Sequence, residues 1–419
     1  MQNDLTESVQ SSIRPGEMMD SYYAGESNTK KQAYPAVVNT RFVQVFTNLG
    51  AGSSQFVISP NGGVSDVVCQ FTTPASTGSN YTLLSLSQGW GYGLINRISV
   101  RYGSSAQYFF SGAQVFLQNV YDAENGVKQD QLLSLGGAAL AGAACGSATA
   151  YVYLKLPHNS CRAQGKPLPF PTDLLVQPIV VTVELFALNS IMVNQGGALS
   201  TAPTTLASAQ LQVKQEMLTD SSDQLARRVD MNSHAYTFPL PYFAQQETQV
   251  QFTTGANPAG QSVNLTGFRA GEVKAVLLWL TTSAGIVTGG GGYNPFNWAL
   301  MNNVILTYNG EQFTRFDAGS SALWNLVENE KLSAVNAVVQ TQGSVASSNV
   351  VSYWTECPFA QVSKAIARES QLTHGKPILN AVVNLQFDAP TANTAFTLHA
   401  VYIYNSSLLC SRGSAEYIF

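Results

Sequence analysis

From Val37 onward, apolar side chains gather in short runs, several of them alternating with polar residues, between clusters of Gly, Asn, Ser and Pro. Most runs are rich in Val, Ile, Thr, Tyr and Phe, which favour strands. This pattern predicts many short strands in a sandwich or a barrel. The clearest runs are Phe42–Phe46, Gln55–Ile58, Val67–Phe71, Ile95–Tyr102, Ala150–Leu156, Ile179–Phe186 and Leu211–Met217.

Helical spacing of apolar residues occurs in only two places. Each apolar stripe follows a strand and a Gly-containing turn, and each predicts one short helix. The first stripe is Phe116, Leu117, Val120 and Tyr121, and the second begins with Leu323, Trp324, Leu326 and Val327.

The strand before each stripe belongs to an internal repeat. Residues 94–102 read LINRISVRY and residues 300–308 read LMNNVILTY, an offset of 206. The same offset places Phe110 on Phe316. It also carries backward along the chain, matching Phe46-Thr47 with Phe252-Thr253, Gln55 with Gln261, Val57 with Val263, and Asp66-Val67 with Glu272-Val273. Because this period is far longer than that of a solenoid repeat, it indicates a duplicated domain.

Each half then has about eight predicted strands with one short helix midway, which suits a jelly roll. The predicted fold is all-β: two tandem eight-stranded antiparallel jelly rolls, each with a short helix, duplicated within one chain. Two unrelated β-sandwiches are the alternative. The predicted divisions are an N-terminal arm (1–36), jelly roll 1 (37–219), a polar linker (220–240) and jelly roll 2 (241–419).

Composition adds a constraint on the surface. Only 11% of the 419 residues are charged, and the net charge is −4. A nucleic-acid binder would show a basic excess, so direct sequence-specific binding of nucleic acid is not expected. A protein of this size normally needs charge for solubility unless much of its surface meets other protein.

Nothing in the sequence predicts catalysis, a metal site or a cofactor. The four histidines, His158, His234, His374 and His399, form no HExxH pattern, and no GxSxG motif occurs. The five cysteines have no metal-knuckle spacing and are expected to be free thiols in a reducing compartment. No signal peptide and no membrane span are expected.

Three segments together resemble a known family. They are the junction with Asp220, Asp223, Arg227-Arg228 and the pair His234 and Tyr236, the C-terminal strand Leu398–Asn405 with its short Gly-bearing tail, and the LINRISVRYG block. With the duplication, they resemble the double jelly-roll major capsid proteins of adenovirus, tailless membrane-containing phages, virophages and nucleocytoplasmic large DNA viruses.

The resemblance implies a viral structural protein of the virion, assembled inside the host cell. Three copies would form a pseudo-hexagonal trimer, and such trimers would tile an icosahedral shell. The implied partners are other copies of the chain, minor capsid or vertex proteins and an internal membrane beneath the shell.

Composition and loop length suggest where copies meet. In the arm, Met18, Met19, Tyr22 and Tyr23 are candidate assembly contacts. The loops Leu135–Gly146, Pro157–Pro171 and Val338–Asn349 are further candidates, although each can equally be a surface loop without a partner. Two other functions stay open: a lectin-like or receptor-binding jelly roll that binds carbohydrate, and a scaffold protein that forms a transient lattice.

Overall fold

The structure is a computed structural model of the whole chain. It describes residues 37–77, 81–121, 126–157, 162–163, 166–167, 169–194, 202–218, 221–240, 242–252, 261–266, 272–282, 298–299, 303–308, 311–316, 354–358, 376–377, 381–386 and 394–418.

The first half of the chain folds into two antiparallel four-stranded layers, here called roll 1. One layer has the order β1-β14-β3-β8, with the short β11 also pairing with β3, and the other has the order β2-β12-β5-β6. The strands are β1 (Val37–Val45), β2 (Gly52–Ile58), β3 (Gly63–Thr72), β5 (Ile95–Tyr102), β6 (Tyr108–Phe110), β8 (Thr149–Tyr153), β11 (Phe170–Pro171), β12 (Ile179–Leu185) and β14 (Ser208–Leu218).

The second half, roll 2, repeats this arrangement. Its layers have the orders β16-β25-β18-β22 and β17-β24-β20-β21. The strands are β16 (Tyr242–Phe252), β17 (Gln261–Leu265), β18 (Glu272–Thr282), β20 (Asn303–Tyr308), β21 (Glu311–Phe316), β22 (Trp354–Pro358), β24 (Ala381–Gln386) and β25 (Thr394–Asn405).

The two halves share one topology. Numbered along each half, the eight main strands lie in the order first, eighth, third and sixth in one sheet, and second, seventh, fourth and fifth in the other. This is the strand order of a jelly roll, so the prediction of two tandem antiparallel jelly rolls is confirmed.

Alternation of apolar and polar residues explains how each sheet buries one face. Along β2, Phe56 and Ile58 point into the sandwich while Gln55 and Val57 point outward. Phe46 packs edge-on against Phe56, with ring centroids 4.7 Å apart. The core of roll 1 therefore lies between its two sheets.

Strand pairing tests the predicted repeat residue by residue. In roll 1, Ile98 pairs with Phe110, and in roll 2, Val304 pairs with Phe316. Both pairs obey the offset of 206, so the repeat is confirmed in this hairpin.

The offset is different in the first three strands of each roll. By strand pairing, Val57 corresponds to Asn264, so the predicted matches of Val57 with Val263 and of Gln55 with Gln261 are wrong by one residue. Thr40 corresponds to Tyr242, so the predicted match of Phe46 with Phe252 is wrong by four residues.

The third strand is shifted as well. Pro171 pairs with Gly63 of β3, and Pro377 of the short strand β23 (Lys376–Pro377) pairs with Glu272 of β18. The structural counterpart of Glu272 is thus Gly63, and the predicted match with Asp66 is wrong by three residues. The prolines themselves are 206 apart, so the shift lies in the strand that they border.

Helices are more numerous than the apolar spacing predicts. The first predicted helix is α4 (Gly112–Tyr121), and the second predicted stripe lies outside the described residues. The sequence did not indicate α3 (Trp90–Leu94), α5 (Gly126–Leu135) or α6 (Ser221–Asn232). Among the described residues, no helix is long and apolar enough to cross a membrane.

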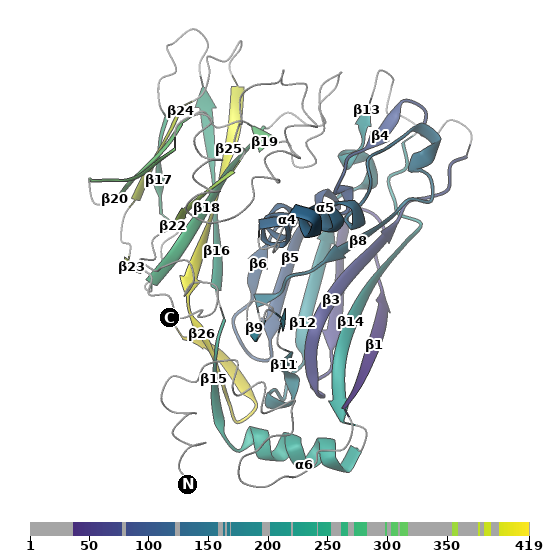
Figure 1. Cartoon of the computed structure of the whole chain (residues 1–419), viewed down its shortest axis with the longest axis vertical. Helices are drawn as coiled ribbons and strands as arrows, with labels where there is room; N and C mark the ends of the chain where they lie inside the picture. Colours follow the sequence, from purple (N-terminus) through teal and green to yellow (C-terminus); the bar gives the residue numbers. More distant parts are fainter. Residues whose placement is uncertain are drawn as a thin grey trace.

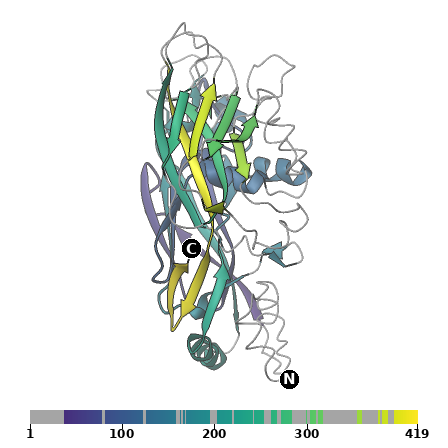
Figure 2. The same ribbon diagram turned by 90° about the vertical axis from the view of Figure 1, so that its left-hand side faces the viewer.

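The segment expected to be a plain polar linker is ordered. After α6, strand β15 (Ala235–Pro239) pairs with β26 (Ser407–Ser411), which forms a hairpin with β27 (Ser414–Ile418). Figure 1 shows the rolls side by side, with α6 across the lower end and this small sheet extending from roll 2 toward α6. In the side view of Figure 2, the same sheet lies below the strands of roll 2.

The remaining strands are short. They are β4 (Leu84–Leu86), β7 (Leu140–Ala141), β9 (Arg162–Ala163), β10 (Lys166–Pro167), β13 (Val193–Asn194) and β19 (Trp298–Ala299).

Candidate assembly surface

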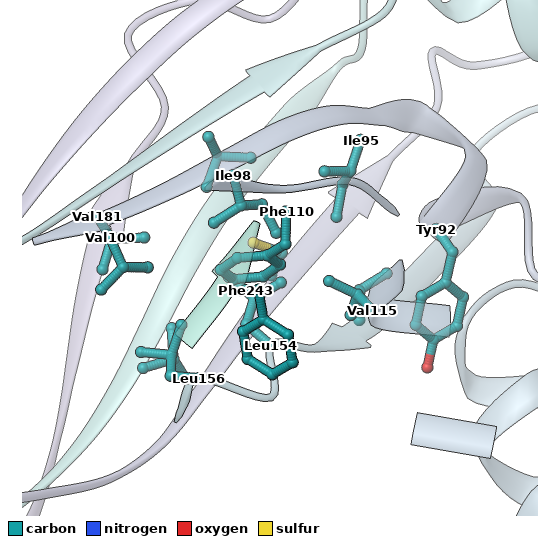
Figure 3. Close-up of a cluster of buried hydrophobic side chains, with 14 of the residues drawn as sticks. Tyr92, Ile95, Ile98, Val100, Phe110, Val115, Leu154, Leu156, Val181 and Phe243 are labelled. Carbon is teal, nitrogen blue, oxygen red and sulfur yellow. The ribbon is translucent and has the colours of Figure 1, made fainter. Parts of the chain in front are cut away.

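The two rolls meet through an apolar junction. Phe243, on β16, lies on the same face of that strand as the exposed residues Gln245 and Gln249, because side chains alternate between the two faces. Its side chain is nevertheless only 6% exposed. Figure 3 shows it lying among Phe110, Leu154 and other roll 1 side chains. One apolar residue on the outer face of roll 2 is therefore buried by roll 1.

Aromatic rings continue this junction toward the C-terminus. Tyr108 of β6 packs edge-on against Tyr242 of β16 and Tyr417 of β27, with ring centroids 6.3 and 6.2 Å apart. Burial raises the pKa of Tyr108 well above its usual value, and the pKa of Tyr417 is raised in the same way. These phenols therefore stay neutral, as suits rings between packed sheets.

The C-terminal hairpin is bonded to roll 1. The hydroxyl of Ser104 accepts from the backbone N–H of Ala415 at 2.9 Å and lies 3.2 Å from its carbonyl oxygen. The N–H of Val176 donates to the carbonyl of Gly413 at 2.9 Å. Gly413 has φ of 79°, and a Cβ there would lie 2.1 Å from Val176, so the turn needs glycine. The hairpin therefore links the end of the chain to the first roll.

On the opposite side of roll 1, the described residues leave the outer face of an edge strand exposed. On β1, the outward row Arg41, Val43 and Val45, here called the β1 face, is exposed, with Val43 at 53% and Val45 at 65%. Among the described residues, β1 pairs only with β14. An edge strand with exposed apolar side chains marks a candidate contact surface.

Apolar side chains are also exposed elsewhere, among them one on β2 and two on α6. Val57, on the outer face of β2, is 49% exposed. On α6, Leu225 and Val229 are exposed one helical turn apart, so they lie on the same side of the helix.

Two ion pairs lie on the outer faces of roll 1. Lys214 lies 3.7 Å from Asp66 near the β1 face, and Arg97 lies 3.2 Å from Glu184 on the other sheet. All four side chains are partly exposed, and such pairs contribute little stability.

The described residues contain no cluster of His, Cys, Asp and Glu that could hold a metal ion. Cys69, Cys145 and Cys410 are buried free thiols, and burial raises the pKa of Cys410 to about 12. A thiol protonated at neutral pH is a poor nucleophile and a poor metal ligand.

Only some of the candidate contacts from the sequence fall on described residues. Met18, Met19, Tyr22 and Tyr23, and the loop Val338–Asn349, are outside the described residues. Of the other two loops, Leu135–Gly146 begins at the end of α5 and contains β7. The loop Pro157–Pro171 contains β9, β10 and β11, and Phe170 of β11 packs against Phe238 of β15, with ring centroids 5.4 Å apart.

Sequence reasoning missed Phe243 and Tyr417. The only available signal was the apolar run AYTFPLPYF at 235–243, which is unusually long for a linker.

Comparisons with known proteins identify the fold. No protein-family model matches the chain, and no curated protein matches it in sequence. Among solved structures, PBCV-1 VP54, fitted into a reconstruction of the virophage Sputnik, has a TM-score of 0.63 at 14% identity, covering 93% of this chain and 98% of that chain. The Faustovirus major capsid protein has a TM-score of 0.55 at 9% identity, covering 98% of both chains.

The mavirus major capsid protein has a TM-score of 0.50 at 11% identity, and the match covers 94% of this chain and 93% of that chain. All three similarities extend over nearly the whole chain, and both rolls have the strand order of a jelly roll. The chain therefore has the double jelly-roll fold of these viral major capsid proteins.

Proposed function

We propose that the chain is a viral major capsid protein that assembles with copies of itself into an icosahedral shell, and that its location is the virion. One observation carries the proposal: two rolls of the same topology lie side by side, joined by the buried Phe243, in a fold shared with capsid proteins over nearly its full length. The role is structural rather than enzymatic.

The assembling unit of the proposal is a homotrimer. Three chains supply six similar rolls, which can close into a pseudo-hexagon able to tile a shell. The two rolls of one chain can still differ where a ring of six identical subunits could not. Low surface charge supports this, because interface cores are depleted in charged residues.

Light scattering coupled to size-exclusion chromatography tests the trimer. We expect a particle of about 135 kDa, three times the 44.9 kDa chain. A monomer that binds glycans would instead support the carbohydrate-binding alternative. Negative-stain microscopy of purified virions then separates a final shell, in which the protein is present, from a transient scaffold, in which it is absent.

The proposal divides the chain into an arm (1–36), roll 1 (37–219), a connecting segment (220–240) and roll 2 (241–419). Its second part concerns the arm. We propose that Met18, Met19, Tyr22 and Tyr23 contact a neighbouring capsomer, a minor capsid protein or an internal membrane. The arm leaves roll 1 at Val37, which pairs with Leu218 near the start of α6.

Deletion of residues 1–36 tests the arm. We expect trimers of the truncated chain to form normally and shell assembly to fail, because the arm would join capsomers rather than build them. Alanine at the four candidate residues should reproduce the defect. Shells of normal yield and size from the truncated chain would contradict the assignment.

A further inference from the structure

The first strand of each roll, β1 or β16, can be matched residue by residue through the strands beside it. Because Gly63 and Glu272 are counterparts, so are the residues that follow them, Val64 and Val273. Each of these pairs with the long last strand of its roll, which in turn pairs with the first strand. The matched rows are Val64, Gln215 and Thr40 in roll 1, and Val273, Tyr404 and Tyr242 in roll 2.

This match identifies the β1 face with the part of β16 that joins the rolls. Since Thr40 corresponds to Tyr242, Arg41 corresponds to Phe243 and Val43 to Gln245. The β16 residues contact roll 1: Phe243 is buried there, and the side-chain amide of Gln245 donates to Gln114 of α4 at 3.3 Å. The same positions in roll 1 are exposed.

The contact within the chain also shows which surface of a roll lies against β16. Roll 1 meets β16 through the edge formed by β6, whose Phe110 lies next to Phe243. In roll 2, β21 takes the place of β6, and Phe316 holds the register position of Phe110. Within the chain, roll 1 uses its β6 edge and roll 2 uses β16. The β1 face of roll 1 and the β21 edge of roll 2 take no part in that contact.

We infer that the β1 face of one copy is covered by the β21 edge of roll 2 of a second copy. This contact repeats between chains what β6 and β16 do within one chain. A head-to-tail contact between two different surfaces generates a ring when the rotation closes. The inference rests on the proposed trimer and names the surfaces that form it.

The two contacts differ in chemistry. Where β16 presents Phe243, β1 presents Arg41. On the neighbouring strand, the residue paired with Arg41 is Lys214, whereas the residue paired with Phe243 is Ile403. Val43 and Val45 remain as the apolar part of the β1 face. The contact between copies is therefore more polar than the permanent junction within the chain, as suits subunits that fold separately before they associate.

The test is the double substitution Val43→Asp, Val45→Asp in the full chain. Carboxylates buried without partners oppose association strongly. We expect the concentration at which half of the trimers dissociate to rise at least about a hundredfold. Light scattering would then report 44.9 kDa particles where the wild type is trimeric. A second variant, Arg41→Glu, should weaken the trimer without touching the core.

The matched control is Val57→Asp, at a similarly exposed valine on β2, the edge strand of the other sheet of roll 1. Its counterpart by register is Asn264, which is exposed, so this variant should stay trimeric. Circular dichroism and thermal unfolding establish that all three variants are folded.

The outcomes separate the two proposals. A monomeric wild type overturns the trimer itself. A trimeric wild type with a trimeric, folded Val43→Asp, Val45→Asp variant overturns the assigned surface and leaves the trimer standing. Dissociation of the Val57→Asp variant to the same extent also overturns the assignment, because the β1 face would then have no special part.

Discussion

Replacing Phe243 by alanine is expected to lower the free energy of unfolding by about 3–5 kcal/mol, the usual cost of removing a buried aromatic ring. The ring fills space between roll 2 and the side chains Phe110, Leu154 and Leu156 of roll 1. Without it the rolls lose an apolar contact that joins them. Urea unfolding followed by tryptophan fluorescence measures the loss, and the two rolls should then unfold in separate transitions.

Gln249→Ala is the control for this variant, because Gln249 lies on the same strand with its side chain exposed. Its free energy of unfolding should stay within about 0.5 kcal/mol of the wild type. If Phe243→Ala behaves like this control, Phe243 does not couple the rolls and the junction has been assigned to the wrong residue.

Tyr417→Ala is expected to have the next largest effect, a loss of about 3–4 kcal/mol of unfolding free energy. The ring of Tyr417 lies 5.4 Å from Tyr242 and 6.2 Å from Tyr108, measured between centroids. It therefore holds the C-terminal hairpin against both rolls. Thermal unfolding measures the loss, and limited proteolysis should show earlier cleavage within residues 407–419.

The neighbouring residue provides the control. Ile418 is also on β27, but its side chain is exposed because strand residues alternate between faces. Ile418→Ala should leave both the thermal midpoint and the cleavage pattern unchanged. Equal destabilisation by both variants would mean that the hairpin as a whole matters and the Tyr417 ring does not.

The fold was predictable because its signals are local and repeated. Runs such as Ile95–Tyr102 and Ile179–Phe186 became β5 and β12 with errors of one residue at most. The LINRISVRY repeat identified equivalent hairpins because strand, turn and next strand all keep one spacing. Duplication of a whole domain is visible in sequence when such a block is conserved internally.

The error in the third strand shows the limit of that signal. Asp66-Val67 matched Glu272-Val273 in sequence. The pairing of β11 with β3 and of β23 with β18 instead makes Gly63 the counterpart of Glu272. Apolar residues recur at every second position of any half-buried strand, so a few similar residues can align in several registers. Only the pairing with the neighbouring strands distinguishes among these registers.

The junction and α6 depended on tertiary contacts. Phe243 occupies an outward position that the strand pattern alone assigns to solvent, and its burial comes from a strand more than 130 residues earlier. Likewise α6 is highly polar, with Asp223, Arg227 and Arg228 in its sequence, and shows no broad apolar stripe. Its contacts with β14 and with residues 172–174 hold a segment whose composition resembles a linker.

The fused pair of rolls has an arithmetical consequence. Because each chain contributes two rolls through one permanent junction, any closed ring of these chains contains an even number of rolls. An icosahedral shell must turn through five-fold positions, and an odd ring cannot be made from paired units. A five-fold corner of the proposed shell can therefore hold five whole chains with ten rolls, or a different polypeptide that contributes a single unit at a time, but it cannot hold a ring of five rolls from this chain.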